Sequence, residues 1–246
     1  MPLLIACLAG VFILVGALLT HVSKDSHKIE AVSFALALGA LVSLMIFDLV
    51  PDIIEGITEG GSSIWLCIIF VFVGFGLLVL LDLFTPDHDD HKDTPENHDN
   101  ENSAHIGIMS ALAVILHNII EGMTVYTLAM SSAQQGAILA ISIGLHNIPM
   151  GMLIYSTLSH KSRFSKWFLT ALVIISTPLG GILMMLMSSL LTEALISALV
   201  SIAAGMIVYL IFMELLPHVI KTRPVKFSLI GVVIGFLAVL LSTILG

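Results

Sequence analysis

Two short stretches of the chain carry imidazole, amide and carboxylate side chains inside long apolar segments. The first, at 117–122, reads HNIIEG, and 29 residues later the chain repeats it at 146–151 as HNIPMG. Such side chains are costly in an apolar segment unless something binds them. A helical spacing of four places His117 and Glu121 one turn apart on the same face, where both can ligate one divalent cation.

The second copy offers a further ligand for the same cation. His146 lies near the middle of its apolar segment, at a depth comparable to that of His117. Helices packed closely at Gly122 and Gly151 would bring the two imidazoles together. Two imidazoles and one carboxylate form a donor set that suits zinc or another first-row divalent cation.

A buried histidine also occurs without a metal, hydrogen-bonded to a carbonyl of a neighbouring helix. That interpretation suits a single His-Asn pair. Two copies, one of them with a carboxylate four residues after the histidine, favour a binding site instead. Glu121 without a partner in the middle of a membrane would cost about 3 kcal/mol, so we expect it to have one.

The composition is that of a membrane protein. Hydrophobic residues make up 58% of the 246 residues and charged residues only 11%, whereas charged residues make up about 25% of a soluble domain. The net charge of -8 comes largely from one loop, and no basic patch indicates nucleic-acid binding. Cys7 and Cys67 lie in apolar segments and form neither a disulfide framework nor a metal motif. The expected partners are therefore the lipid bilayer and divalent metal ions.

Eight segments reach the length of roughly 20 apolar residues that a membrane-spanning helix needs. They are residues 2–20, 31–51, 63–84, 105–130, 136–157, 167–190, 194–217 and 227–245. The boundary between the sixth and seventh segments is the weakest, and a count of seven would need one long bent helix there. We therefore expect an all-α integral membrane protein whose residues 1–246 form a single domain.

The distribution of positive charge favours eight spans. All nine Lys and Arg residues fall in alternate loops, and the loops between them, around 52–62, 131–135 and 188–193, contain none. Because cytoplasmic loops are enriched in Lys and Arg, both termini are expected outside the cytoplasm, in a multi-pass protein of the cell membrane. A count of seven would place the last cluster on the wrong side.

One hydrophilic loop, at 85–105, is rich in His and Asp and has no apolar content to fold around, so we expect a disordered cytoplasmic loop. It is either a solvated linker or a weak site of cation capture through His88, His91 and His98.

A second repeated pattern lies at two predicted helix ends. Residues 47–51 read FDLVP and residues 212–217 read FMELLP, at opposite faces of the membrane in the topology above. The helices with the two His-Asn stretches also run in opposite directions. Such echoes indicate an inverted structural repeat, which is typical of transporters with a site at the membrane midplane. Asp48 and Glu214, with His218 beside Glu214, are then expected at the two mouths of a pathway, or are simply acids solvated at the headgroups.

These residues resemble the ZIP (ZRT/IRT-like) family of divalent metal transporters, in particular its bacterial ZupT/GufA-like branch. The resemblance covers nearly the whole chain and is most specific at 117–122 and 146–151. It implies uptake of zinc, iron or related ions toward the cytoplasm by a 3+2+3 bundle of eight helices. In such a bundle helices 1, 4, 5 and 6 move against 2, 3, 7 and 8, with a two-metal centre between helices 4 and 5, and homodimers are common.

The chain departs from the family pattern at two positions. Met150 replaces a glutamate on helix 5, and Thr177 replaces a glutamate before Pro178 on helix 6. Thioether and hydroxyl groups are poor ligands for a hard dication, so we predict one effective site built on His117, Glu121 and His146. The full set of expected metal-binding residues is His117, Asn118, Glu121, His146, Asn147 and Met150, with Asn118 and Asn147 secondary and Thr177 on the pathway.

The predicted function is uptake of a divalent cation, with zinc first and iron, manganese or cobalt as alternatives, by alternating access. The cation enters near Asp48, binds at the His/Glu site and leaves past Glu214 and His218. It is the transported substrate, and no cofactor is expected. The alternatives are an intramembrane metal-dependent hydrolase, which would need a defined general base, and a metal-binding membrane protein that does not transport.

Overall fold

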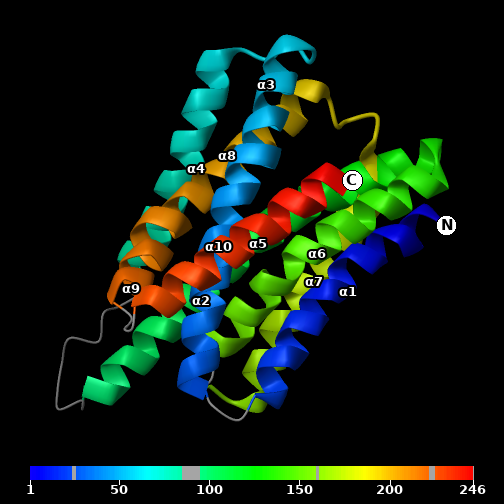
Figure 1. The fold of residues 1–246 in the computed structure, drawn as a ribbon. Helices are drawn as coiled ribbons and strands as arrows, with labels where there is room; N and C mark the ends of the chain where they lie inside the picture. The colour runs from blue at the N-terminus through cyan, green and yellow to red at the C-terminus, as the bar shows by residue number, and fades with distance from the viewer. Residues whose placement is uncertain (24–25, 85–94, 159–160, 222–224, 246) are drawn as a thin grey trace.

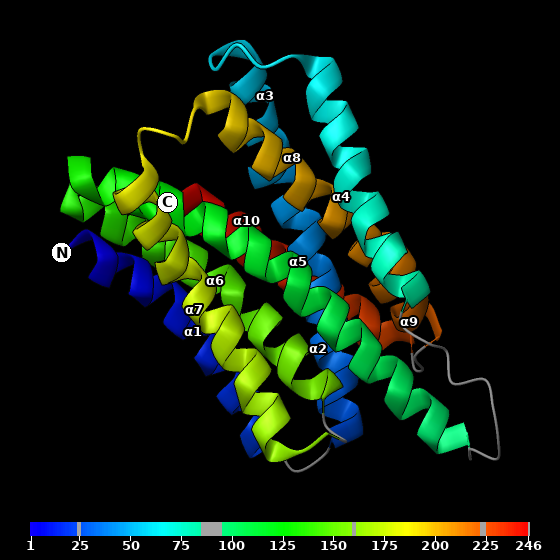
Figure 2. The same ribbon diagram turned by 180° about the vertical axis from the view of Figure 1, so that it is seen from behind.

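The chain is a bundle of long helices (Figure 1, Figure 2). A computed structural model describes residues 1–23, 26–84, 95–158, 161–221 and 225–245, and every regular element in these ranges is helical. In chain order the elements are α1 (Pro2–Val22), α2 (Ser26–Leu44), η1 (Met45–Leu49), α3 (Val50–Thr58), α4 (Ile64–Phe84), α5 (Pro95–Ser131), α6 (Ala133–Thr157), α7 (Arg163–Met187), α8 (Glu193–Tyr209), η2 (Leu210–Leu215), α9 (Leu216–Lys221) and α10 (Val225–Leu245).

Seven helical stretches among the described residues are long and apolar enough to cross a membrane. One of them, Lys28–Thr58, joins α2, η1 and α3, and another, Glu193–Lys221, joins α8, η2 and α9. The apolar stretch described in α10, Ser228–Ile244, is shorter. The chain is thus an all-helical, multi-pass membrane protein whose helices overlap the eight predicted segments.

Two helices continue past the prolines at which the sequence predicts that they end. They run to Thr58 and Lys221 instead of stopping at Pro51 and Pro217. A proline inside a helix lacks the N–H donor, and its ring clashes with the carbonyl four residues earlier. In both places the wider turns of a π-helical segment, η1 or η2, come just before the proline and alter the hydrogen-bond ladder there. The helix therefore continues through the proline in both places.

Helix α5 begins earlier than the predicted boundary. The sequence predicts a loop up to residue 105, whereas α5 starts at Pro95. Proline is favourable at the first position of a helix, where its missing N–H would have no intrahelical partner. Residues 85–94, which include His88 and His91, lie outside the described part of the chain, and so does the side chain of His98.

Four pairs of helices pack closely: α1 with α6, α5 with α7, α2 with α10, and α4 with α8. In every pair each helix places a glycine against a backbone carbonyl oxygen of the other helix. The glycines and the residues whose carbonyls they face are Gly16 and Ile148, Gly151 and Ile13 (α1–α6); Gly122 and Thr177, Gly180 and Ile119 (α5–α7); Gly39 and Val232, Gly235 and Leu36 (α2–α10); Gly74 and Ile202, Gly205 and Val71 (α4–α8). These close approaches leave no room for a Cβ.

The glycines of the two repeated stretches do not pack against each other, so that expectation is wrong. Gly122 faces α7 and Gly151 faces α1. Their effect on the site is indirect: each fixes its own helix against a different neighbour. The helices α5 and α6 also contact each other, and His117 and His146 approach Glu121 from these two helices.

Candidate metal centre

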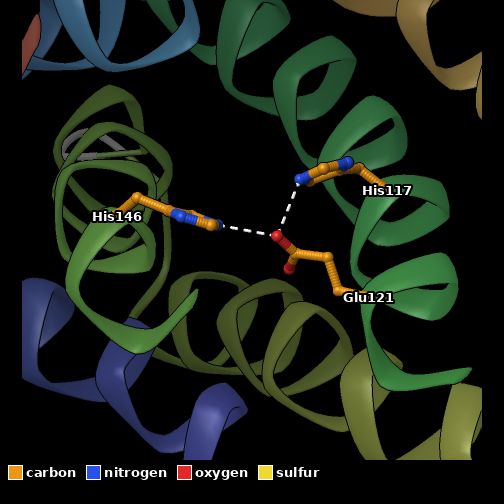
Figure 3. Close-up of side chains that lie close together, drawn as sticks. All are labelled: His117, Glu121 and His146. Carbon is orange, nitrogen blue, oxygen red and sulfur yellow. Dashed lines mark hydrogen bonds and ion pairs between the residues drawn. The ribbon is translucent and has the colours of Figure 1, made fainter. Parts of the chain in front are cut away.

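Three buried side chains from α5 and α6 meet at one carboxylate oxygen (Figure 3). The Nε2 atom of His146 lies 2.7 Å from Oε1 of Glu121, and Nε2 of His117 lies 3.0 Å from the same oxygen. His117 and Glu121 come from adjacent turns of α5, as their spacing predicts, and His146 reaches across from α6. The structure thus brings together the three residues expected to form the main site.

The centre is almost completely shielded from the surroundings. The exposed fractions are 5% for His117, 6% for Glu121 and 6% for His146. A carboxylate accepts hydrogen bonds and cannot donate them, so an imidazole that hydrogen-bonds to Glu121 does so through a hydrogen on Nε2. In the absence of a cation, these contacts satisfy part of the charge of a carboxylate that would otherwise be isolated in a low-dielectric interior.

Several polar atoms around the centre have no hydrogen-bond partner among the described residues. They are Nδ1 and Nε2 of His117, Oδ1 of Asn118, Oε2 of Glu121 and Oγ1 of Thr177; the short approach of His117 Nε2 to Glu121 is an ion-pair contact without hydrogen-bond geometry. Buried polar groups in proteins are nearly always hydrogen-bonded, and a group that is not calls for an unseen water or ion. Four of these atoms belong to residues 117–121, so the polar atoms that lack a partner are concentrated at the histidine–carboxylate centre.

The spacing of the donor atoms is close to what a cation needs. All three ligand atoms lie within 4.8 Å of one another. Zinc with bond lengths of about 2.0–2.2 Å in tetrahedral geometry would hold its ligands about 3.3 Å apart. The two nitrogen–oxygen distances of 2.7 Å and 3.0 Å therefore require only a small outward movement of the Glu121 carboxylate.

The two asparagines anchor the helices that carry the ligands. Nδ2 of Asn118 donates to the Val173 carbonyl of α7, and Nδ2 of Asn147 donates to the Ala9 carbonyl of α1. Each asparagine lies four residues before the glycine that packs on the same neighbouring helix. Both amide groups thus hold their helices in place, and direct binding of the cation by an amide oxygen stays a prediction.

The two positions that depart from the family pattern lie in different surroundings. The Thr177 hydroxyl is buried on α7, where the backbone carbonyl of the same residue faces Gly122, next to Glu121. Met150 is buried in the main hydrophobic cluster of the bundle. Its thioether is accommodated by apolar packing, and ligation of a cation by Met150 stays a prediction.

The π-helical segment η1 carries Asp48 close to the buried centre. The Asp48 carboxylate interacts electrostatically with His117, Glu121 and His146. Asp52, one turn further on, interacts with His117 and Glu121 as well. Asp52 was not expected near the centre from the sequence, although its spacing of four from Asp48 is a signal that indicates it.

A second cluster of possible ligands forms at the other π-helical segment. Nε2 of His105 lies 2.9 Å from Oδ1 of Asp82 and 3.8 Å from Oε1 of Glu214, and the Tyr209 hydroxyl donates to Glu214 over 3.3 Å. The residues come from α4, α5 and η2, so only the position of Glu214 was expected from the sequence. The ring of His218 stacks on Phe34 with centroids 3.7 Å apart and is not among the clustered ligands.

Comparisons with known proteins agree with this description. A sequence model of the family described as "ZIP Zinc transporter" matches residues 84–243. The zinc transporter ZupT of Streptococcus mutans is 28% identical over 256 residues, which cover 98% of this chain and 96% of that protein. The zinc transporter ZupT of Chlorobaculum parvum is 30% identical over 257 residues, which cover 97% and 94%. That of Clostridium perfringens is 25% identical, with 100% and 95% covered.

Proposed function

This chain belongs to the ZIP zinc transporter family, and from this premise we propose that it takes up a divalent cation through the site formed by His117, Glu121 and His146. Zinc is the first candidate, because the relatives are named zinc transporters. Iron, manganese and cobalt are the alternatives, since imidazole and carboxylate ligands also suit other first-row divalent cations.

The observation that carries this proposal is the convergence of two imidazoles on one buried carboxylate. A buried acid with two histidines is expensive to maintain in a membrane and usually marks a pathway or a binding site. The unpartnered atoms of His117, Asn118 and Glu121 support the same conclusion, because a cation with its remaining water would satisfy them.

We propose that the eight predicted spans form an inverted repeat in which α1 corresponds to α7 and α6 to α5. The contacts support this, because α6 contacts α1 through Asn147–Ala9 and Gly151–Ile13, and the same positions of the first copy, Asn118 and Gly122 on α5, contact Val173 and Thr177 of α7 in the same way. The α2–α10 and α4–α8 pairs, and the π-helical segments η1 and η2, correspond in the same way. The Lys and Arg residues favour both termini outside the cytoplasm.

This topology gives each acidic cluster a role in alternating access. Asp48 and Asp52 would attract the hydrated cation at the outer mouth, and Glu121 with the two histidines would replace its water. Asp82, His105 and Glu214 would receive it at the inner mouth. As each step replaces oxygen and nitrogen ligands with similar ones, the cation need not be stripped of all its ligands at any point.

Flux into vesicles tests the proposal. Purified protein in liposomes with a fluorescent zinc indicator inside is expected to admit zinc with saturable kinetics, while protein-free liposomes admit none. A protein that only binds metal would bind it without filling the lumen, and a hydrolase would show no flux either. Either result would refute transport. Competition among zinc, iron, manganese, cobalt and cadmium in the same assay would rank the substrates.

Uptake should fall at acidic pH. A histidine binds a metal through an unprotonated nitrogen, so protons compete with the cation. Because a higher proton concentration favours the protonated nitrogens over the metal-bound ones, we expect uptake at low zinc concentration to fall several-fold when the outer pH decreases from about 7.5 to about 5.5. Saturating zinc should restore most of the rate. A rate that rises on acidification would contradict direct competition at the histidines.

The inner cluster can be tested at Glu214. Replacing Glu214 with glutamine keeps the side chain's shape and its contact with Tyr209 but removes the negative charge. We expect Glu214→Gln to reduce the maximal zinc flux about tenfold, as outer-shell changes at metal sites do, with little change in the zinc concentration that gives half of that flux. An unchanged maximal flux would exclude the inner cluster from the pathway.

A further inference from the structure

A cavity of about 250 Å3 lies at the end of the bundle where α1 and α6 end and α7 begins. Arg163 and Lys166 contribute two positive charges to its wall from adjacent positions of one turn of α7. Ser23 adds a hydroxyl group, while the hydroxyls of Thr20 and Ser156 line the cavity but donate to the carbonyls of Gly16 and Leu153. Among the described residues, none that lines the cavity is acidic. Such a set of donors and cations fits an anion.

Aromatic rings make one wall of the cavity rigid. The Tyr155 hydroxyl and Nδ1 of His21 lie 2.8 Å apart in a hydrogen bond, and both rings pack against Trp167, at centroid distances of 5.0 Å and 5.7 Å. The Lys166 ammonium lies 5.8 Å from the centre of the Tyr155 ring, within the range of a cation–π contact. The Lys166 ammonium therefore lies against the aromatic wall of the cavity.

The cavity lies at the level of the lipid headgroups. Three membrane-spanning helices end or begin around it, and tryptophan and tyrosine are enriched at that level of a bilayer. On the adjacent face of α7, Phe164 and Phe168 are stacked and exposed over 77% and 54% of their surfaces. Exposed aromatic rings of this kind suit contact with acyl chains, so the cavity is bordered by a surface for lipid.

We propose that this cavity binds the phosphate of an anionic phospholipid headgroup. The guanidinium of Arg163 has the planar fork that matches phosphate oxygens, and Lys166 adds a second charge. Basic pockets between transmembrane helices are known to take such headgroups. The volume is below the roughly 300 Å3 at which pockets for drug-sized ligands begin, which suits a headgroup whose chains remain in the bilayer.

The bound lipid would connect the helices that support the metal centre. The polar lining residues of helices come from α1, α6 and α7, and α2 adds Ile29. Of these helices, α6 carries His146, and α1 and α7 hold the asparagine anchors. An anion shared by α1, α6 and α7 would resist their separation at this end. For this the cavity has to lie at a membrane surface, whatever the direction of transport.

The test compares two double variants that remove the same charge. The first variant, Arg163→Gln with Lys166→Gln, removes both positively charged side chains from the cavity lining. Lys161→Gln with Lys221→Gln removes two exposed positive charges that do not line it. Thermal unfolding is measured in phosphatidylcholine bilayers with increasing amounts of phosphatidylglycerol. For the original chain and the Lys161/Lys221 variant we expect phosphatidylglycerol to raise the melting temperature. For the Arg163/Lys166 variant, half-maximal stabilisation should require at least about five times more of it.

Three results would overturn the proposal. Equal losses in both variants would assign the effect to general surface charge. An undiminished response of the Arg163/Lys166 variant would remove the cavity from consideration. Inorganic phosphate that produced the same stabilisation in pure phosphatidylcholine would identify a free anion in place of a lipid. An Arg163→Lys variant keeps the charge but loses the planar fork, so we expect a response between those of the original chain and the Arg163/Lys166 variant, which separates loss of charge from loss of folding.

Discussion

Replacing Glu121 with alanine should reduce zinc uptake by more than about a hundredfold. Removing an outer-shell partner of a metal site costs roughly 10–100-fold, and Glu121 is more central than such a partner. It is the only acid in the buried set of three ligands, and its Oε1 atom is the point at which both imidazoles meet. Without it, two buried histidines would have to hold a dication with no compensating charge.

Two further variants show whether charge is the cause. Glu121→Gln keeps the length of the side chain and should be nearly as inactive, because an amide is neutral and a weaker ligand. Glu193→Gln removes an acid from the exposed first turn of α8 and should transport normally. All three proteins are to be compared at equal amounts of folded protein in vesicles. Near-normal zinc uptake by Glu121→Gln would contradict the proposed role of the carboxylate.

The sequence predicts the proximity of the three candidate ligands because most of their geometry is local. His117 and Glu121 are four residues apart in one helix, so helix geometry alone places them together. His146 could be added because the chain repeats the same pattern on the next apolar segment. The long apolar helices were also recognisable, since a bilayer demands long apolar stretches whatever the tertiary contacts are.

The contacts that could not be predicted from the sequence are those between residues of different helices, because they depend on which helices become neighbours. Asp82, His105 and Glu214 come from three elements, and no local spacing connects them. A proline in a sequence usually indicates the end of a helix, so Pro51 and Pro217 led to predicted helix ends. The π-helical segments η1 and η2, which let the helices continue there, depend on the packing around each proline and have no signal in the local sequence. The predicted homodimer concerns a partner chain and stays a prediction.

Gly122 is another residue whose neighbour could not be predicted from the sequence, and its replacement is expected to lower stability strongly. The sequence suggests that Gly122 packs against the neighbouring segment, but it lies against α7, where an added Cβ would be 1.9 Å from the Thr177 carbonyl oxygen. That oxygen belongs to a helix backbone and cannot rotate away, so α5 and α7 would have to separate. Overpacking of an interior typically costs about 1–3 kcal/mol.

Gly122→Ala is therefore expected to lower the melting temperature in bilayers by about 4 °C or more, with a loss of zinc uptake because the helix that carries His117 and Glu121 moves. Gly76 provides the matched control, since a Cβ there would meet nothing within 4 Å. Because alanine favours a helix over glycine by about 0.5–1 kcal/mol, Gly76→Ala should keep or slightly raise the melting temperature. If both variants unfolded at the same temperature as the original chain, the α5–α7 contact would not be the rigid support of the metal centre. A loss confined to Gly122→Ala would show that the close approach of these two backbones, and not helix propensity, maintains the position of the ligands.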